Sequence, residues 1–325
     1  MQGVILAAGR GTRLYPLTRT RSKAMLPVLG KPIVARIMED LEACGVGEFV
    51  VVVAQDDREI IPYFRSDSTT VARPKFVTQE QPLGMADALS CAAPEITGDF
   101  VLSACDNLVD RTDMGRVVDA WNESPSLSAV LAVMQVPPDK VSRSGIVETD
   151  GRWITKVVEK PTLDEAPSNI ASLPLYCFPR SFLDLLAAVE PSPRGERELQ
   201  DAIQTTIERN GRVRAVSVPH RLTLTDPADL LTINLRYLAR EAEFAAPSSP
   251  ETGPNSRLVM PLYVDQDAQI GAGCEIGPNV YLERGCRIGN GARVRNSLVL
   301  RDSIVADGQT VEGQIVSGTD LIPAS

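Results

Sequence analysis

A six-residue repeat near the C-terminus restricts the fold of this 325-residue chain more than any other feature. Large apolar residues recur at intervals of six, at Val264, Ile270, Ile276, Leu282, Ile288, Val294 and Leu300. Such a period is typical of a parallel β-helix, in which each short repeat buries its apolar residue against the repeats above and below. We therefore predict a β-helix that serves packing or association between subunits rather than catalysis.

The residues before the repeat have the pattern of an α/β domain. Short β-branched runs alternate with amphipathic segments, which predicts a mostly parallel sheet covered by helices. We expect strands at Val4–Leu6, Phe49–Val53, Lys75–Thr78, Phe100–Ala104, Ala129–Val133, Ser172–Phe178 and Val213–Val218, and a hairpin around Asp150-Gly151. We expect helices at Ile33–Cys44, Asp57–Phe64, Met85–Ala92, Asp113–Asn122, Ser181–Val189 and Asp226–Phe244. A Pro/Ser/Gly-rich linker at 245–257 then separates a domain of residues 1–244 from a repeat domain of residues 258–325.

Composition narrows the function. A formal net charge of −9 argues against a nucleic-acid binder, because affinity for a phosphate backbone needs a concentrated basic surface. No apolar stretch approaches the roughly 20 residues that span a bilayer, so we expect no membrane association. The six scattered cysteines form no CxxC pair, which suits a reducing compartment, and we expect a cytoplasmic protein. The chain has a single histidine, His220, which argues against catalysis by histidine.

The N-terminal stretch Leu6–Pro27 has the residues of a phosphate-binding loop. It follows an apolar run, and its glycines, Gly9 and Gly11, let backbone N–H groups approach a ligand closely. Arg13 can bind two phosphate oxygens at once, and Lys23 supplies a point charge. The stretch therefore predicts a binding site for a polyphosphate.

The loop after the third expected strand suits a flat ring. The side-chain amide of Gln79 offers a donor and an acceptor side by side, which can pair with the imide edge of uracil or thymine. Pro82 and Gly84 shape a turn that admits such a ring. The alternative is a plain Pro/Gly connection before a helix.

Two further loops carry charged residues. Asp106 follows the expected strand Phe100–Ala104, where its carboxylate suits Mg²⁺, or alternatively an Asx-turn or a helix cap. Glu159 and Lys160 are adjacent and point to opposite faces of a strand, so both can bind one ligand only if the backbone turns at Pro161. The alternative is a solvated strand end.

Taken in order, these motifs resemble those of the sugar-phosphate nucleotidylyltransferases over nearly the whole chain. The resemblance rests on Leu6–Arg13, Pro16-Leu17-Thr18, Lys23 with Leu26-Pro27, Gln79 with Leu83-Gly84, Asp106-Asn107 and Glu159-Lys160-Pro161. The segment Gly11–Pro16 is most similar to the thymidylyl and uridylyl branches. The resemblance implies a Rossmann-like sheet and a short left-handed β-helix of two or three coils, and we expect a homo-oligomer.

The resemblance also implies the reaction. A sugar 1-phosphate attacks the α-phosphorus of a nucleoside triphosphate in line and releases pyrophosphate, which needs positioning and charge stabilisation more than a protein nucleophile. Arg13, Lys23 and Asp106 have the implied catalytic roles, with Mg²⁺ held by Asp106. The implied nucleotide-binding residues are Leu6, Ala7, Ala8, Gly9, Gly11, Thr12, Arg13, Gln79, Gly84 and Asp106. The implied sugar-phosphate-binding residues are Lys23, Gly145, Glu159 and Lys160.

The sequence departs from the family pattern at three positions. Thr223 stands where a second metal-binding aspartate is usual, and Cys105 replaces the glycine before Asp106. Pro174 replaces a glycine whose amide commonly touches the sugar, and proline has no N–H to donate. Thr223 and Pro174 suggest one alternative to an active transferase that uses dTTP or UTP, namely a regulatory subunit that binds nucleotides or NDP-sugars. A second alternative comes from the repeat: an acyltransferase built on the β-helix, although the repeat contains no histidine base.

Overall fold

The computed structural model describes residues 1–66, 72–124, 126–241 and 251–324, which form two compact units. Unit 1 comprises residues 1–10, 22–24 and 34–222, and unit 2 comprises residues 11–21, 25–33 and 223–325. Part of the predicted linker, residues 245–250, and the predicted end of the last helix, residues 242–244, lie outside the described residues. No helix among the described residues is long and apolar enough to cross a membrane.

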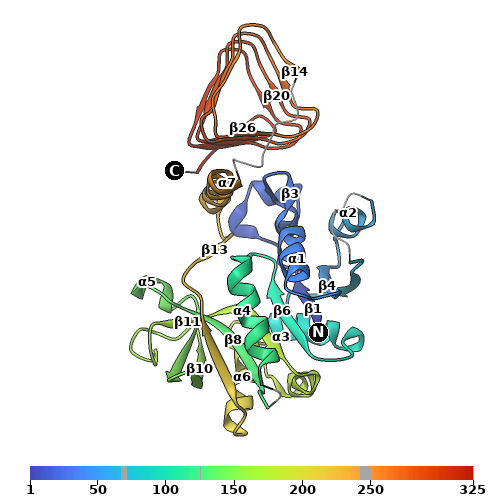
Figure 1. The fold of residues 1–325 in the computed structure, drawn as a ribbon, viewed down its shortest axis with the longest axis vertical. Helices are drawn as coiled ribbons and strands as arrows, with labels where there is room; N and C mark the ends of the chain where they lie inside the picture. The colour runs from blue at the N-terminus through green and yellow to red at the C-terminus, as the bar shows by residue number, and fades with distance from the viewer. Residues whose placement is uncertain (67–71, 125, 242–250, 325) are drawn as a thin grey trace. The chain divides into compact units, whose positions relative to one another are not determined.

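One half of the sheet of unit 1 is parallel (Figure 1). β1 (Gln2–Leu6) lies between β4 (Glu48–Ala54) and β6 (Phe100–Ala104), and β5 (Lys75–Gln79) extends the sheet beside β4. β1, β4 and β6 are short, apolar and mostly buried, as parallel strands covered on both faces must be, whereas the edge strand β5 is largely accessible. The predicted strands are confirmed here, and their carboxyl ends meet at one edge.

The other half of the sheet is mostly antiparallel. β11 (Ile170–Phe178) pairs antiparallel with β6 and with β8 (Ala129–Gln135), while β12 (Val213–Ser217) runs parallel to β8. The predicted hairpin is formed by β9 (Gly145–Asp150) and β10 (Trp153–Glu159). The order of the nine strands is β5-β4-β1-β6-β11-β8-β12-β10-β9.

Pro174 interrupts the register of β11. Leu173 lies opposite Ala132 and Tyr176 lies opposite Leu131, so Pro174 and Leu175 form an irregularity in the β11–β8 pairing. Proline cannot donate to a strand ladder and is found at bulges for that reason.

Helices cover both faces of this sheet. The helices α3, α6 and η5 pack on one another over an apolar core that includes Tyr176 and Phe178. The intervening Cys177 contacts Val117 of α4, and strand residues alternate between faces, so α4 covers the opposite face. The helices and short elements of unit 1 are α1 (Ile33–Ala43), α2 (Ile60–Ser66), α3 (Met85–Ala92), η4 (Ala93–Glu95), β7 (Asn107–Val109), α4 (Arg111–Asn122), α5 (Pro138–Val141), η5 (Arg180–Ala188), α6 (Leu199–Glu208) and β13 (Arg221–Thr223).

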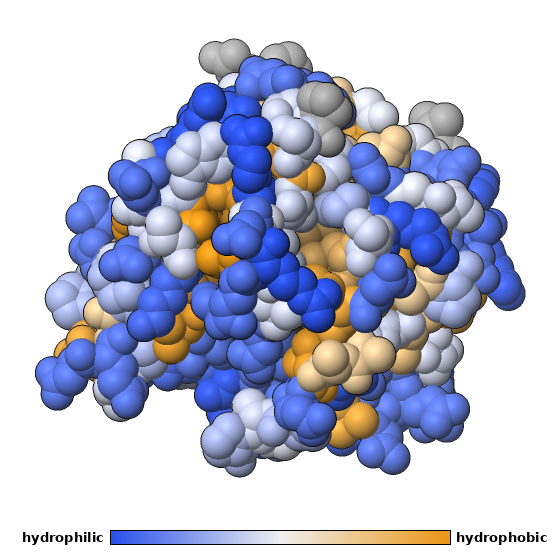
Figure 2. Space-filling model, turned by 90° about the horizontal axis from the view of Figure 1, so that it is seen from below, coloured by the Kyte–Doolittle hydropathy of each residue, from blue (hydrophilic) through white to orange (hydrophobic). Residues whose placement is uncertain are grey.

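Two predicted helices differ from those observed. The segment predicted as Ser181–Val189 forms a 3₁₀ helix, η5, and α2 begins three residues after the predicted Asp57. Asp57 is instead the cap of α2, since its carboxylate accepts the N–H groups of Ile60 (3.1 Å) and Ile61 (3.2 Å). The surface seen in Figure 2 is largely hydrophilic, with apolar side chains visible mainly in the hollows between polar ones.

The C-terminal repeat of unit 2 forms the predicted β-helix, whose coils trace a triangle in Figure 1. Its three faces are parallel sheets that stack an apolar core, and β26 (Asp320–Pro323) closes one face antiparallel to β25. The strands are β14 (Glu251–Thr252), β17 (Gln269–Ile270), β20 (Arg287–Ile288) and β23 (Ile304–Val305); β15 (Arg257–Leu258), β18 (Glu275–Ile276), β21 (Arg293–Arg295) and β24 (Thr310–Glu312); β16 (Leu262–Val264), β19 (Val280–Leu282), β22 (Ser297–Val299) and β25 (Gln314–Ser317).

The β-helix is longer than its apolar repeat suggests. Each face stacks at least four strands, which makes four coils rather than two or three, and the first strands lie within the segment 245–257 predicted as a linker. Leu258 of the first coil precedes Val264 by six residues and so extends the same apolar repeat, although it is 37% exposed. The repeat also slips by one residue in a later coil, where Val299 rather than Leu300 lies in register with Leu282.

The rest of unit 2 packs beside the β-helix. The long helix α7 (Pro227–Glu241) contacts β25, β26 and β2 (Pro27–Val28), and β2 pairs with β3 (Lys31–Pro32). Asp226 caps the N-terminus of α7, because its carboxylate accepts the N–H of Asp229 at 3.1 Å. Three 3₁₀ turns occupy the N-terminal segment, namely η1 (Thr12–Leu14), η2 (Leu17–Arg19) and η3 (Lys23–Met25).

Candidate active site

The carboxyl ends of β1, β4 and β5 surround a hollow of about 160 Å³. Ligands of open α/β sheets bind at this edge, because loops from neighbouring parallel strands converge there. The predicted residues Ala8 and Gln79 contribute to it, whereas Arg10, Gln55 and Asp56 were not predicted. The lining residues are Ala8, Arg10, Ala54, Gln55, Asp56, Gln79, Glu80 and Pro82.

The glycine-rich loop leaves β1 beside this hollow. The N–H of Ala7 donates to Val52 of β4 at 2.8 Å and Leu6 accepts from Cys105, so these two predicted residues are held by the sheet. Gly9 is exposed, and a side chain added to it would meet nothing within 4 Å. Neither packing nor backbone conformation requires glycine at that position, whereas a closely bound ligand does.

The remainder of the loop belongs to unit 2. Gly11 adopts a left-handed conformation, with φ of 64°, and this favours glycine on conformational grounds alone. Thr12 and Arg13 begin η1, and both side chains are exposed. The loop therefore presents Arg13 to solvent from a short, ordered turn.

Gln79 ends β5 and is 6% exposed. Its Nε2 donates to the carbonyl of Gly84 (3.2 Å) and to the carboxylate of Asp87 (2.8 Å). Both partners are acceptors, which fixes the amide orientation and leaves Oε1 as the group available to a ligand. Gln79 thus has an acceptor to offer a base, and the predicted donor half of its amide is already used.

Gly84 is shaped by its neighbours. Its φ is +102°, and a side chain there would lie 2.6 Å from the carbonyl oxygen of Arg197. The backbone of Arg197 holds this turn through two hydrogen bonds. Its N–H donates to the carbonyl of Leu83 at 2.7 Å, and its carbonyl accepts the N–H of Ala86 at 3.1 Å. Glycine is therefore required at this turn for structural reasons, whatever its role toward a base.

Lys23 and Asp106 form an ion pair at the end of β6. Their side chains are 12% and 29% exposed, so Lys23 is largely buried while part of Asp106 stays accessible. Adjacent Cys105 is buried, and burial raises the pKa of its thiol to about 12, which keeps it protonated and chemically inert. The structure brings together a cation and a carboxylate that the sequence predicted separately.

Asp106 suits a magnesium ion that also binds substrate. No group of three or more His, Cys, Asp or Glu residues able to hold a metal occurs in the described part of the chain. Mg²⁺ does not need one, because it keeps several waters and commonly takes one or two carboxylates plus phosphate oxygens. The donor set therefore fits an ion that arrives with a triphosphate. Thr223 ends β13 and belongs to unit 2.

A buried acceptor lies between β9 and β10. Glu159 pairs with Lys160 (3.3 Å) and Arg194 (3.8 Å) through Oε1, while its buried Oε2 has no partner among the described residues. A side chain on Gly145 would meet Oε2 of Glu159 and the hydroxyl of Ser172, each at 2.9 Å. Glycine at position 145 therefore keeps this acceptor open.

The predicted turn beyond Glu159 comes one residue early. Lys160 itself has a positive φ of 45°, so the backbone turns there and not at Pro161. A residue before proline is restricted, and this unusual conformation lets Lys160 reach the carboxylate of its neighbour.

Gln200 is a site residue that the sequence analysis missed. It is 4% exposed on α6, and its Oε1 is a second buried acceptor with no partner in the described part of the chain. Its Cγ lies 3.0 Å from the position of a side chain on Gly145, next to Glu159 Oε2. Two unpaired buried acceptors from residues that both border Gly145 call for hydrogen-bond donors, such as ligand hydroxyl groups. No motif indicated this, because only the fold brings α6 to β9.

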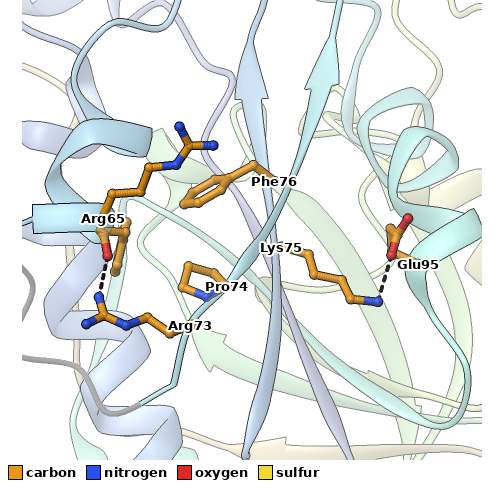
Figure 3. Close-up of a pocket in the computed structure, with 7 residues that line it drawn as sticks. Arg65, Arg73, Pro74, Lys75, Phe76 and Glu95 are labelled. Carbon is orange, nitrogen blue, oxygen red and sulfur yellow. Dashed lines mark hydrogen bonds and ion pairs between the residues drawn. The ribbon is translucent and has the colours of Figure 1, made fainter.

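A larger hollow of about 580 Å³ lies at the opposite end of β5 (Figure 3). Arg73 donates to the carbonyl of Phe64 at 2.7 Å, and Lys75 pairs with Glu95 at 2.8 Å. Two of its three cations therefore already have partners, and we assign it no role.

A family model, the nucleotidyl transferase, matches residues 2–220 of this chain. The chain belongs to the nucleotidyl transferase family. A second model, the GMPPB C-terminal domain, matches residues 258–323, the β-helix. The predicted resemblance is thereby confirmed.

Curated members of the nucleotidyl transferase family are similar over different lengths. The UTP–glucose-1-phosphate uridylyltransferase AglF of Haloferax volcanii is 36% identical over 231 residues, which is 70% of this chain and 93% of AglF. The glucose-1-phosphate thymidylyltransferase of Streptomyces griseus is 28% identical over 341 residues, covering 100% of this chain and 91% of that protein. The nucleotidyltransferase Agl11 of Haloferax volcanii is 34% identical, and the chain spans only 57% of its length.

Solved structures show the same fold for this nucleotidyl transferase. A UTP-bound UGPase from Acinetobacter baumannii superposes with a TM-score of 0.65 at 23% identity, over 74% of this chain and 93% of that one. A UDP-glucose pyrophosphorylase in complex with UDP-glucose gives the same TM-score at 22% identity, over 74% and 98%.

Glu159→Gln is expected to stabilise the protein at neutral pH while weakening sugar-phosphate binding. Burial raises the pKa of Glu159 in the folded state. The ionised carboxylate therefore destabilises the folded protein, and this destabilisation is absent below the pKa of Glu159 in the unfolded chain and develops as the pH rises through its pKa in the folded protein. The gain in Tm over wild type should therefore be larger at pH 8 than at pH 4, by calorimetry. A lower Tm for the variant at pH 8 would contradict this reading.

Proposed function

We propose that the chain transfers a nucleoside monophosphate from a nucleoside triphosphate, dTTP or UTP, to a sugar 1-phosphate and releases pyrophosphate. The observation that carries this proposal is the pairing of Lys23 with Asp106 at the sheet edge, 83 residues apart in sequence. It lies in the same unit as the hollow at Gln79 and the open acceptors at Glu159 and Gln200. Family membership and the relatives named above support the same class of reaction.

Different residues of the chain have different roles in an in-line displacement. Lys23 binds the reacting phosphates and neutralises their charge, and Arg13 with the exposed amides of its loop binds the departing pyrophosphate. Asp106 would hold Mg²⁺, which supplies charge neutralisation at the phosphate oxygens when bound. Lys160 binds the sugar phosphate, and no protein nucleophile is required.

The base and the sugar are recognised by acceptors. Oε1 of Gln79 can accept the N3–H of uracil or thymine. On the sugar side, Glu159 Oε2 and Gln200 Oε1 accept hydroxyl protons, and Gly145 leaves space for them. Pro174 lies at a bulge of β11 and has no backbone N–H to offer the sugar, so the sugar is recognised here without that donor.

The decisive test uses a mixed pool of triphosphates and sugar 1-phosphates with Mg²⁺. Mass spectrometry should detect an NDP-sugar together with an equal amount of pyrophosphate. Folded protein that gives no NDP-sugar from any combination would overturn the proposal. Tight, Mg²⁺-indifferent binding of nucleotide without product would instead identify the regulatory alternative.

Gln200→Ala should raise the KM for the sugar 1-phosphate about fivefold, because one hydrogen bond is worth roughly 1 kcal/mol. The KM for the triphosphate should not change, since Gln200 lies on the sugar side. Gln204→Ala is the matched control, because Gln204 lies one turn along α6 and bonds the backbone of Val157. The control should lower Tm and leave both KM values unchanged. Equal rises in both KM values for Gln200→Ala would contradict its role.

We further propose that the protein is a cytoplasmic homo-oligomer. All six cysteines are free thiols, in keeping with a reducing compartment. The β-helix exposes Met260 and Ile304, which are 51% and 48% accessible and suit an apolar contact. Light scattering on the purified protein should give a mass above the 35.1 kDa of one chain.

A further inference from the structure

The segment that carries Arg13 belongs to the same compact unit as the β-helix. Residues 11–21 and 25–33 belong to unit 2 together with α7 and the β-helix. Leu14 and Leu17 are buried, at 0% and 2% exposure, so the segment is anchored by its apolar side chains while Arg13 stays exposed. The triphosphate loop is therefore built partly on the C-terminal repeat.

A buried ion pair makes the strongest attachment. Nη1 of Arg21 donates to Oε2 of Glu283 at 3.0 Å, and the two side chains are 6% and 9% exposed. The same oxygen of Glu283 accepts the N–H of Arg301 at 2.8 Å. Glu283 follows β19, so its carboxylate is fixed by a regular coil of the β-helix, and it holds Arg21 in one direction.

Two neutral contacts attach the other end of the segment. The hydroxyl of Tyr281, a fully buried residue of β19, accepts the N–H of Gly30 at 3.1 Å. The amide of Asn234 on α7 accepts from Leu29 at 2.9 Å and donates to the carbonyl of Pro27 at 3.0 Å. Both ends of the segment are thus tied to the C-terminal part of the chain.

Local contacts carry the constraint from Arg21 to Arg13. The hydroxyl of Thr18 donates to the carbonyl of Gly11 at 2.8 Å, and the N–H of Arg19 donates to Pro16 at 3.1 Å. η1 and η2 contact each other, so residues 11–19 form one small folded body. A displacement of Arg21 is therefore transmitted to the turn that presents Arg13.

We propose that Glu283 is a positioning residue of the transfer reaction, which holds Arg13 in place through Arg21. This inference rests on the proposed function, in which Arg13 binds the triphosphate. The β-helix then has a role within each protomer, as part of the support of the active-site loop. A small misplacement of a substrate-binding group is enough to lower a rate by up to about 100-fold.

A double-mutant cycle between Glu283→Gln and Arg13→Lys tests this role. Glu283→Gln should raise the KM for dTTP or UTP roughly tenfold and leave the KM for the sugar 1-phosphate unchanged. If Glu283 acts through Arg13, the double variant should bind triphosphate no worse than Arg13→Lys alone. A merely structural defect would lower kcat or raise the KM values of both substrates alike, and its effect would multiply with that of Arg13→Lys.

Glu275→Gln is the matched control. Glu275 also forms an ion pair from a coil of the β-helix, with Arg295, but that pair is exposed and lies outside the segment. The control should have wild-type KM values. Wild-type protein that consumes no triphosphate would overturn the proposed function and this inference together. Two outcomes in an active protein would overturn this inference alone. One is an unchanged KM for the triphosphate in Glu283→Gln, and the other is a double variant in which the effects of Glu283→Gln and Arg13→Lys multiply.

A second variant covers the case in which Glu283→Gln does not fold. Arg21→Met/Glu283→Leu removes both charges, and buried ion pairs replaced by apolar residues commonly keep their stability. This protein should melt near the wild-type temperature and still show the raised KM for triphosphate. A wild-type KM in this folded variant would overturn the proposal.

Discussion

Asp106→Asn is expected to lower Mg²⁺-dependent pyrophosphate release by about 1,000-fold. The substitution keeps the shape of the side chain but removes the charge that pairs with Lys23 and that would hold the metal, and metal ions contribute several kcal/mol of charge stabilisation in phosphoryl transfer. A coupled pyrophosphate assay at saturating triphosphate measures kcat. Raising the Mg²⁺ concentration should recover part of the loss, since weakened metal binding is its cause.

Glu95→Gln controls for the loss of a lysine–carboxylate pair as such. Glu95 pairs with Lys75 at the opposite end of β5, where both side chains are exposed. Its removal should change neither kcat nor Mg²⁺ dependence, because exposed pairs contribute little. Asp106→Asn protein with wild-type turnover would remove Asp106 from the reaction.

Arg13→Ala should reduce kcat/KM for the triphosphate by about 1,000-fold, as expected for an arginine that stabilises charge on a transferring phosphate. Arg13 is exposed on η1, so its removal leaves no cavity and Tm should stay at the wild-type value. Arg13→Lys should recover part of the activity, because lysine restores the charge and not the two-oxygen geometry. In the reverse direction, the KM for pyrophosphate should rise with the same ranking.

Arg19→Ala is the control for net charge in the same segment. Arg19 ends η2 and is exposed, six residues beyond Arg13. It should behave as wild type at physiological salt, where exposed charges are largely screened. Equal losses for Arg13→Ala and Arg19→Ala would show a general electrostatic effect in place of specific binding.

The sequence predicted most clearly those parts of the fold that local patterns determine. β1, β4 and β6 are short, mostly buried and largely apolar runs whose pattern needs no knowledge of the partner strand. The antiparallel direction of β11 escaped prediction, because β11 and β8 show similar apolar runs whichever way they pair. The first coil of the β-helix escaped as well, since an end coil exposes one face and has less need of buried residues.

The candidate site divides in the same way. Three site residues lie at or just after the end of a strand and within recognisable motifs, so the sequence alone indicated them: Gln79, Asp106 and Glu159. Gln200 lies on a helix with no motif, and its importance follows from a missing hydrogen-bond partner that only coordinates can reveal. The engaged donor of Gln79 likewise depends on Asp87, which nothing in the sequence links to it.

The pairing of Arg21 with Glu283 also bears on synthesis of the chain. The ribosome makes Arg21 262 residues before its partner Glu283, so the loop around Arg21 has no counter-charge while the intervening chain is translated. Contacts of such long sequence separation form slowly and late. A nascent chain stopped before the β-helix should therefore keep this loop hydrated and accessible to protease, and the loop should become protected only when the last coils emerge.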